Sequence, residues 1–445
     1  MDYREALAYI HGLHRFGISL GLHRMQRLAR VLGAPHEGLK VVHVGGTNGK
    51  GSTSAMAAAM LEAAGYRVGL YISPYLEDFR ERIQLNGRPV AAERVADLAA
   101  RVRPAVDRVA RETGEHPTEF EVVTAMGFLY FQEEQVDVLI LEVGLGGRYD
   151  ATNIVSSPLV CALTPIDLDH VDRLGESLSA IAYDKAGIIK PGGVVVSAPQ
   201  HPEALSVVER VCREQGARLF LGGRELTWRQ VSASAEGQVI DLQVSGELSA
   251  CGGGPRRYAG LFLRLPGPHQ VVNAATAVGV VEALGGKGFT VQEEAVRRGL
   301  AGVRWPGRLE ILGRSPWVVL DGAHNPAGAA SLRRSLGLFP HRHLILVLGV
   351  LEDKQAGPML DELVPPARVV LATRPSSPRA LRAAVLAEMI RPYGRETVIE
   401  EDIALALEKA LGLAGSGDLV LVCGSLYLVG EARSYLRNRL PGGKV

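Results

Sequence analysis

The chain has 445 residues, of which 47% are hydrophobic, and at about 150 residues per domain this is enough for two or three packed domains. Its 49 Lys and Arg residues nearly balance its 48 Asp and Glu residues. That balance excludes a basic nucleic-acid-binding surface and an acidic solvating tail as the dominant feature of the molecule.

Membrane and targeting signals are not evident. No uninterrupted apolar run approaches the roughly 18 residues that a membrane span requires, and the first residues, MDYREALAYIHGLHRF, do not have the pattern of a signal peptide. The four cysteines show no C-x-x-C spacing, which argues against a zinc ribbon. We therefore expect a cytoplasmic monomer that binds neither nucleic acid nor a membrane.

Short β-branched runs alternate with helical patterns in the N-terminal half of the chain. Strands are predicted over 39–44, 67–71, 136–143, 160–163 and 194–197, with helices over 52–64 and 119–133. This alternation predicts a mostly parallel sheet with helices on both faces.

From about residue 225 to 265 the pattern changes to alternating segments separated by glycine-rich turns, which predicts a small antiparallel sheet attached to the main one. Helices are predicted over 272–284 and 292–300. The segment AGVRWPGRLE then places the domain boundary near residues 302–307. The expected domains are residues 1–301 and 308–445.

The C-terminal domain resumes the alternation, with strands in WVVLD, LILVLGV, RVVLAT and DLVLVCG and helices from about residues 327, 378 and 403. The expected fold is an α/β protein: a P-loop-type, mostly parallel sheet domain with a small antiparallel β decoration, and a smaller Rossmann-like α/β domain. Ligands are expected at the carboxyl ends of the parallel strands.

The sharpest motif is KVVHVGGTNGKGSTSAMAAAM, an apolar strand that runs into a glycine-rich turn and an alanine-rich helix. Such a turn aims backbone N–H groups and a helix N-terminus at a phosphate, and Lys50 adds a positive charge. The motif departs from the standard phosphate loop, because Val44 replaces the first glycine and Gly51 precedes Ser52. Ser52 is the hydroxyl best placed for a phosphate-bound Mg²⁺, with Thr53 as the alternative.

Two later segments carry polar residues where a strand ends. In VDVLILEVGLGGRYDATN the strand ends at Glu142, and an acid at that position holds Mg²⁺ opposite the phosphate loop in nucleotide hydrolases. The alternative is a core strand that simply ends in a solvated glutamate. The segment LTPIDLDHVDRLG carries His170. His11 and His14 have no carboxylate at matching spacing, so we interpret them as surface or packing residues.

Seven motifs occur in order along the chain: GTNGKGS at 46–52, SPYL with ERIQLNG at 73–87, PTEFEVVT at 117–124, LEVGLGGRYDATN at 141–153, DLDHVDRLG at 167–175, DKAGIIK at 184–190 and DGAHNP at 321–326. Together they resemble the folylpolyglutamate synthase and dihydrofolate synthase family, which belongs to the Mur ligases, ATP-dependent amide ligases. The resemblance extends over essentially the whole chain. It implies an enzyme that uses ATP and Mg²⁺ to join L-glutamate to a pterin or folate acid.

The resemblance also implies roles for particular residues. It assigns the phosphate loop to ATP through Thr47, Asn48, Gly49, Lys50, Gly51 and Ser52. It makes Ser73, Glu142 and His170 ligands of two Mg²⁺ ions. Lys185 stands where the family carries a carbamylated lysine, so catalytic roles are expected for Lys50, Glu142, His170 and Lys185.

Further ATP contacts are implied across a cleft between the domains, through Asn273, Arg308 and Asp321. From the residues alone, Asn273 as a helix cap, and Arg308 or Asp321 as ties between linker and domain, are the alternatives. His324 is expected to help seat the incoming amino acid.

For the pterin substrate the family match indicates three short segments: Leu20, Gly21, Leu22, Thr118, Glu119, Phe120, Glu121, Tyr149, Asp150 and Ala151. An aromatic ring such as that of Phe120 offers a stacking face for a flat heterocycle, and carboxylates accept hydrogen bonds from its amino groups. The alternative for Phe120 is plain helix core. Tyr75 departs from the family's SPHL motif but leaves Ser73 in place.

Dihydropteroate and tetrahydrofolate need the same activation as acceptors, an acyl phosphate formed from ATP with release of ADP and phosphate. The segments TEFE and YDA resemble the dihydropteroate pocket of bifunctional bacterial members, so we expect both activities. The alternatives are a monofunctional folylpolyglutamate synthase, another Mur-type ligase and a non-catalytic phosphate-loop module.

Overall fold

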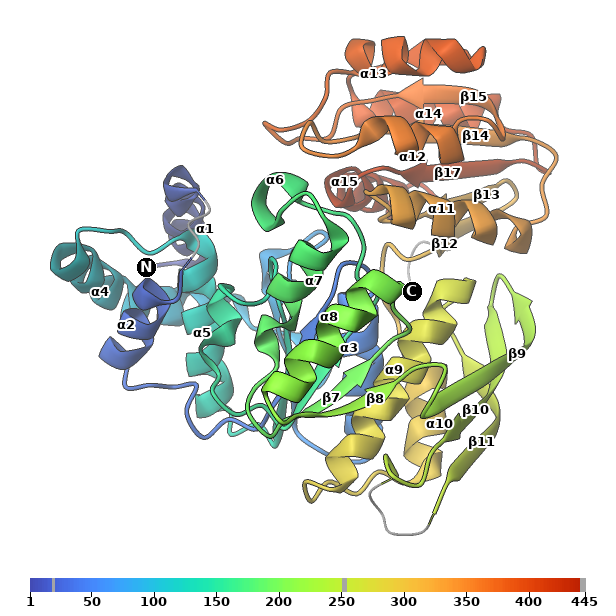
Figure 1. Ribbon diagram of the computed structural model, residues 1–445. Helices are drawn as coiled ribbons and strands as arrows, with labels where there is room; N and C mark the ends of the chain where they lie inside the picture. The colour runs from blue at the N-terminus through green and yellow to red at the C-terminus, as the bar shows by residue number, and fades with distance from the viewer. Residues whose placement is uncertain (18–20, 250–253, 441–445) are drawn as a thin grey trace. The chain divides into compact units, whose positions relative to one another are not determined.

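The computed structural model describes residues 1–17, 21–249 and 254–440. Within them the chain forms two compact units (Figure 1). The first contains Met1–Arg229, Asp241–Leu261 and Val272–Val303, and the second contains Gln230–Ile240, Phe262–Val271 and Arg304–Val445. The predicted ranges 1–301 and 308–445 stay a prediction. The two units differ from the predicted ranges at the inserted sheet, because Gln230–Ile240 and Phe262–Val271 group with the C-terminal residues.

The N-terminal unit is built on an eight-stranded sheet. In spatial order its strands are β4 (Arg88–Pro89), β3 (Ile83–Leu85), β2 (Val68–Tyr71), β5 (Val138–Glu142), β1 (Val41–Gly45), β6 (Val160–Leu163), β7 (Val194–Ser197) and β8 (Arg218–Leu221). Six neighbouring strands run parallel, namely β2, β5, β1, β6, β7 and β8. The β3–β4 hairpin adds an antiparallel edge beside β2. The mostly parallel sheet predicted from the sequence is confirmed.

Helices cover both faces of this sheet. One face packs against α1 (Tyr3–Gly12), α2 (His23–Val31), α4 (Ala92–Thr113) and α5 (Glu119–Glu133), and farther along the sheet against α7 (Leu178–Lys185) and α8 (Pro202–Glu214). Figure 1 shows α1, α2, α4 and α5 gathered as one group, coloured blue to teal. The other helices of this unit are α3 (Lys50–Ala63), α6 (Val171–Leu174), α9 (Pro268–Gly285) and α10 (Glu293–Gly302), with 3-10 turns η1 (Leu13–Phe16), η2 (Phe79–Arg82), η3 (Ala151–Ile154) and η4 (Ala186–Ile188).

Close helix packing on the opposite face depends on two glycines. A Cβ on Gly299 of α10 would lie 2.6 Å from the backbone of Met60 in α3, and one on Gly279 of α9 would lie 2.9 Å from Val196 of β7. Any larger side chain would push these helices apart. The sheet is therefore buried on both sides, which explains why its strands are continuous apolar runs rather than alternating ones.

The inserted sheet consists of β9 (Leu226–Ser234), β10 (Gly237–Val244) and β11 (Arg256–Leu263) in the order β11-β10-β9. Because only two residues connect the neighbouring strands β9 and β10, the two strands form an antiparallel hairpin.

The C-terminal unit contains a six-stranded sheet in the order β12 (Glu310–Arg314), β13 (Trp317–Leu320), β17 (Leu419–Cys423), β14 (Leu344–Leu348), β15 (Ala367–Ala372) and β16 (Glu396–Ile399), parallel except for β12. Its helices are α11 (Pro326–Ser335), α12 (Ala356–Leu363), α13 (Ala383–Ile390), α14 (Ile403–Leu413) and α15 (Leu426–Arg437), with 3-10 turns η5 (Leu336–Leu338) and η6 (Arg391–Tyr393). This second α/β sheet agrees with the predicted fold class.

The helix predicted from residue 378 is wrong in its start, because α13 begins at Ala383. The residues before it bind the loop after β14 instead, with Leu381 N donating to Val350 O at 3.0 Å and Glu352 N donating to Arg379 O at 2.7 Å. Those backbone bonds hold the segment in an extended form that no helix allows.

Candidate functional site

The carboxyl ends of four neighbouring strands place most of the predicted N-terminal site residues along one edge of the sheet. The spatial order β2-β5-β1-β6 brings together the turns that follow these strands. Ser73 follows β2, Glu142 ends β5 beside Val44 of β1, and His170 lies in the loop after β6. Motifs as far apart in sequence as Thr47 and Asp167, which are separated by 120 residues, thus share one sheet edge, as expected for a parallel sheet.

Two glycines in the turn from β1 to α3 make the phosphate loop possible. Gly46 and Gly49 have φ values of 136° and 88°, which side-chain-bearing residues rarely adopt. A Cβ on Gly46 would lie 2.0 Å from Thr164 Oγ1, and one on Gly49 would lie 2.2 Å from Asn273 Oδ1. Asn273, predicted as an ATP contact, is therefore packed directly against the phosphate loop.

Side chains at either end of the loop fix its shape. Thr47 Oγ1 donates to Asp167 O and accepts from Asp167 N, each at 3.0 Å. Lys50 begins α3, and its Nζ donates to Thr47 O at 3.0 Å. The predicted loop residues Asn48, Gly51 and Ser52 lie in the same turn and the first turn of α3. The loop and the N-terminus of a 14-residue helix together form a positively polarised site suited to phosphate.

Ser73 and Glu142 provide oxygen atoms suited to a divalent cation. Glu142 is 5% exposed, and its Oε2 accepts from Ser73 N at 3.3 Å. Ser73 Oγ is buried and has no hydrogen-bond partner within the part of the chain that the structure describes. A buried hydroxyl of this kind beside a carboxylate fits Mg²⁺, which prefers oxygen ligands and retains water or phosphate oxygens around it.

No group of three or more His, Cys, Asp or Glu side chains suited to hold a metal ion occurs among the described residues. A Mg²⁺ ion at this edge would therefore need oxygens of the nucleotide in addition to those of Ser73 and Glu142. Such dependence is typical of Mg²⁺ sites that form with a bound triphosphate.

His170 has an unusual backbone conformation. Its φ of 51° and ψ of 42° are left-handed, and its N–H donates to Asp169 Oδ1 at 2.9 Å. The side chain is about one-third exposed. Such conformations in residues other than glycine are uncommon and concentrate at functional sites.

Lys185 lies against the phosphate loop. It is 4% exposed, and its Nζ donates to Gly46 O at 3.0 Å. Burial, together with the nearby Lys50, lowers the pKa of Lys185 to about 7. The turn after β5 packs on the same segment, because a Cβ on Gly147 would lie 2.7 Å from Lys185 O. Lys185 is therefore the only predicted catalytic residue for which the structure gives both a phosphate-loop contact and a strongly lowered pKa.

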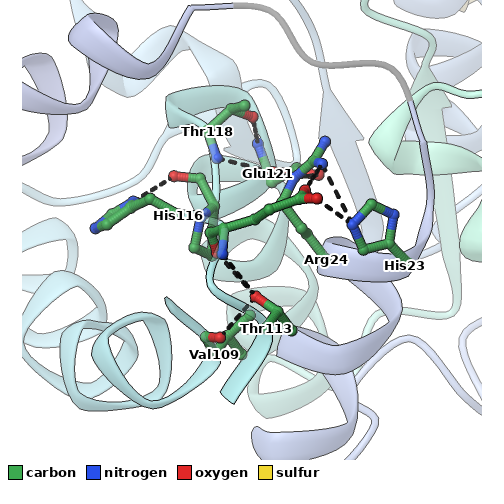
Figure 2. A network of polar contacts seen from close by, with 9 residues as sticks. His23, Arg24, Val109, Thr113, His116, Thr118 and Glu121 are labelled. Carbon is green, nitrogen blue, oxygen red and sulfur yellow. Dashed lines mark hydrogen bonds and ion pairs between the residues drawn. The ribbon is translucent and has the colours of Figure 1, made fainter. Parts of the chain in front are cut away.

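The predicted acceptor segment 118–121 begins α5 (Figure 2). Thr118 Oγ1 accepts from Glu121 N, and Glu121 Oε2 accepts from Thr118 N at 2.7 Å, which is a capping box. Phe120 packs on the turn after β5, since a Cβ on Gly144 would lie 2.3 Å from its ring. Glu119 Oε2 lies 2.7 Å from His14 Nδ1. His14, interpreted as a surface or packing residue, has a side chain that is 72% exposed, and the fold brings it a carboxylate from a distant helix.

The segment 149–151 divides into different environments. Tyr149 is 48% exposed, whereas Asp150 and Ala151 are buried. The Asp150 carboxylate accepts from Leu145 N at 2.8 Å and from Thr152 N at 3.0 Å, and burial raises its pKa. Asp150 thus holds the turn after β5 together, which is a structural role alongside the predicted substrate contact.

The remaining acceptor residues lie before α2. Leu22 is the N-cap of α2 and Gly21 precedes it with a φ of 134°. Leu20 lies outside the described residues.

The predicted C-terminal site residues gather on the turn after β13. The carboxylate of Asp321 accepts from Leu309 N and Ala323 N, both at 2.9 Å, and burial raises its pKa while Arg308 opposes that shift. A Cβ on Gly322 would lie 2.0 Å from Arg308 Nη1, so the guanidinium lies over that glycine. His324 Nδ1 lies 2.8 Å from Gly322 O. Asp321 thus ties the linker to its sheet, as the structural alternative proposed.

Sequence inspection missed Gln200, which follows β7. Its Oε1 accepts from Ile166 N at 2.9 Å, and its Nε2 donates to Thr164 O and Ser197 Oγ, both at 3.1 Å. Through these bonds it holds the loop after β6 that also contacts Thr47. A polar residue just beyond a predicted parallel strand was the available signal.

Comparison with known proteins identifies the class of protein to which this site belongs. The Mur ligase middle domain matches residues 44–281, and the Mur ligase glutamate ligase domain matches residues 307–426. The first of these regions contains the phosphate loop, Glu142 and Lys185, and the second contains Arg308 and Asp321.

Individual relatives match nearly the whole chain. A dihydrofolate synthase/folylpolyglutamate synthase from Bacillus subtilis is 36% identical over 438 residues, covering 98% of this chain and 99% of the relative. The structure of Mycobacterium tuberculosis folylpolyglutamate synthase complexed with ADP and AMPPCP superposes with a TM-score of 0.89 at 33% identity, covering 98% of this chain and 99% of that one. The structure of E. coli FolC in complex with DHPP and ADP gives a TM-score of 0.86 at 32% identity, covering 99% and 98%.

The chain therefore belongs to the dihydrofolate synthase/folylpolyglutamate synthase family of the Mur ligases, and it is an ATP-dependent ligase. None of the helices among the described residues is both long and apolar enough to span a membrane.

Proposed function

We propose that this protein joins L-glutamate to both dihydropteroate and tetrahydrofolate, with cleavage of ATP to ADP and phosphate. The observation that carries the proposal is the convergence of the phosphate loop, Glu142 and Lys185 at one sheet edge, with Phe120 of the predicted acceptor segment packed on the turn that follows Glu142. The proposed substrates are small molecules, and the protein is proposed to act as a monomer.

The chemistry follows from the poor reactivity of a carboxylate. An acceptor carboxylate oxygen attacks the γ-phosphorus, the bond to the β-phosphate oxygen breaks, and ADP leaves. The glutamate nitrogen then attacks the acyl carbon, loses a proton and expels inorganic phosphate, which retains one oxygen of the original carboxylate. Lys50 and the N–H groups at the start of α3 would stabilise the negative charge that moves during the first step.

We propose that Ser73, Glu142 and His170 hold two Mg²⁺ ions with the nucleotide. Bound Mg²⁺ would neutralise phosphate charge that otherwise repels the acceptor carboxylate. The buried Ser73 hydroxyl and the Glu142 carboxylate support this assignment.

Asn273, Arg308 and Asp321 are proposed to contact ATP. Asn273 has the strongest support, because its amide lies against Gly49 of the phosphate loop. Arg308 would add positive charge near the phosphates, and His324 would help seat the glutamate substrate.

The proposed acceptor site uses segment 118–121, Gly21, Leu22 and residues 149–151. Phe120 would stack on the pterin ring, and Glu119 would accept hydrogen bonds from its amino groups.

Lys185 is proposed to carry a carbamate. Its neutral amine would add to CO₂, forming a C–N bond and releasing a proton, so that a buried cation becomes an anion near the metal site. Burial of the amine, together with the positive charge of the nearby Lys50, disfavours the ammonium form and supports this proposal.

Phosphate release tests the proposed function. Purified protein with ATP, Mg²⁺ and L-glutamate should release phosphate when either dihydropteroate or tetrahydrofolate is added. Release with tetrahydrofolate alone would favour the second candidate, a monofunctional folylpolyglutamate synthase; a Lacticaseibacillus casei relative that is 34% identical over 451 residues is named folylpolyglutamate synthase alone. Release with neither acceptor would contradict the proposed function.

A further inference from the structure

Arg24 is among the largest fully buried side chains of the described residues, and the mechanism above does not use it. It is 2% exposed and projects from the first turn of α2 (Figure 2). Its Nε donates to Glu121 Oε2 at 3.3 Å, and its Nη1 donates to Glu115 Oε2 at 2.6 Å. A buried guanidinium is costly unless paired, so the carboxylates that meet it are essential to its position.

Glu121 serves two partners with one carboxylate. Its Oε2 accepts from Thr118 N in the capping box and also from Arg24 Nε. Arg24 therefore binds the residue that fixes where α5 begins. Glu121, predicted as a substrate contact, is engaged in holding this turn, and its side chain is 5% exposed.

The turn that Arg24 holds carries two other residues of the predicted acceptor segment. Glu119 and Phe120 lie between the capping residues Thr118 and Glu121. Phe120 also presses on Gly144 in the turn that follows Glu142. A shift of this helix start would move the acceptor groups, while the phosphate loop has its own supports in Thr47 and Gln200.

Arg24 also lies close in sequence to another predicted acceptor segment, residues 20–22. It follows Gly21 and Leu22 by only a few residues, at the start of α2. One side chain thus links the segment before α2 to the first turn of α5, although the two are about a hundred residues apart in sequence.

We propose that Arg24 is the positioning residue of the acceptor site: it sets the affinity for the pterin acid by fixing the first turn of α5 relative to the start of α2, and it leaves ATP binding unaffected. The proposal rests on the proposed function, because it assumes that Glu119 and Phe120 contact the acceptor.

The test compares Arg24→Met, which keeps the bulk and removes both ion pairs, with Arg24→Lys, which keeps the charge. Arg24→Met should raise KM for dihydropteroate by about ten- to a hundredfold, since small misplacements of binding groups cost up to about 10²-fold. KM for ATP should not change, and ATP binding measured by calorimetry should match wild type. Arg24→Lys should recover part of the acceptor affinity.

Arg27→Met is the matched control. Arg27 lies one turn farther along α2, and its Nε donates to Glu112 of α4 at 2.7 Å. Its loss removes an ion pair between α2 and α4 without touching the first turn of α5, so acceptor KM should not change. An equal rise in acceptor KM for Arg27→Met and Arg24→Met would overturn the proposal, because general loosening of α2 would then be the cause.

The outcomes separate the two proposals. Wild-type protein that turns over neither acceptor contradicts the proposed function, whereas an active wild type with unchanged acceptor KM in Arg24→Met contradicts the role of Arg24. If Arg24→Met fails to fold, the Glu115→Gln variant tests the role of Arg24 instead. It removes the half-exposed partner and should raise acceptor KM in the same direction by a smaller factor; unchanged acceptor KM there and in Arg24→Lys would overturn the proposal.

Discussion

The phosphate-loop edge and the start of α5 are held in place by different means. At the phosphate loop the supports are mostly backbone groups: Lys50 and Lys185 both donate to loop carbonyls, and two glycines allow the close approach of Thr164 and Asn273. At the start of α5 the supports are charged side chains, above all Arg24 and Glu121. The first is recognisable from a local glycine-rich motif, although Lys185 and Asn273 reach it from distant segments, whereas the charged pair that holds the second has no local signal.

This difference predicts that variants at the phosphate loop change the kinetics with ATP, whereas variants at the start of α5 change KM for the acceptor. Removing Lys50 should have the largest effect. Lys50→Ala should lower turnover by about 10²- to 10³-fold, the usual effect of deleting one preorganised group that stabilises developing charge, while dihydropteroate binding measured by calorimetry persists. Lys40→Ala, which removes an exposed lysine before β1, is the control. Unchanged ATP turnover in Lys50→Ala would contradict the assignment of the loop.

Lys185→Gln should have the next-largest effect. It should lower turnover by about 10- to 100-fold, as for other groups that support a metal site. Lys190→Gln is the control, since Lys190 Nζ donates to Asn153 O, away from the loop. Wild-type activity in CO₂-free buffer should fall and recover on addition of bicarbonate. Activity that does not respond to CO₂, with native mass lacking the adduct, would refute the carbamate.

The pH dependence of stability gives a second test of Lys185 in unmodified protein. Its folded pKa of about 7 lies below the ordinary value of 10.5, so between these pH values the folded protein binds fewer protons than the unfolded chain. Stability should therefore rise with pH across that window. The rise should disappear in Lys185→Gln, as measured by denaturant unfolding at several pH values.

Gln200→Met should have the smallest effect. It removes three bonds that hold the loop after β6, and a net effect at the phosphate loop of about 1 kcal/mol, the worth of one hydrogen bond, corresponds to a rise in KM for ATP of about fivefold. Acceptor KM should not change. Tyr66→Phe, which loses a bond to Thr290 at the opposite edge of the sheet, should change neither KM. A rise confined to acceptor KM in Gln200→Met would break the distinction between the two regions.

The same distinction explains what the sequence could predict. The strands β6 and β7 and the helix α5 have the predicted bounds, because continuous apolar runs and a Thr-x-x-Glu capping box are local signals. The glycine-rich motif of the phosphate loop is also a local signal. The hairpin strands β3 and β4 were not predicted, since short, partly exposed edge strands have little apolar pattern.

Side-chain partners from distant segments were beyond prediction. Arg24 is one of several charged residues in its helix. Nothing near it in sequence indicates that it pairs with Glu121, which lies 97 residues farther along the chain. The partners of His14 and Gln200, which are Glu119 and Ile166, are likewise fixed only by the fold.

The fate of the acceptor's carboxylate oxygens tests the proposed mechanism most directly. Dihydropteroate labelled with ¹⁸O in its carboxylate is turned over with ATP, Mg²⁺ and L-glutamate, and the released phosphate is examined by mass spectrometry. An acyl phosphate predicts that each phosphate carries one ¹⁸O atom. Phosphate without ¹⁸O, or label found in AMP, would contradict transfer of the γ-phosphate to the acceptor.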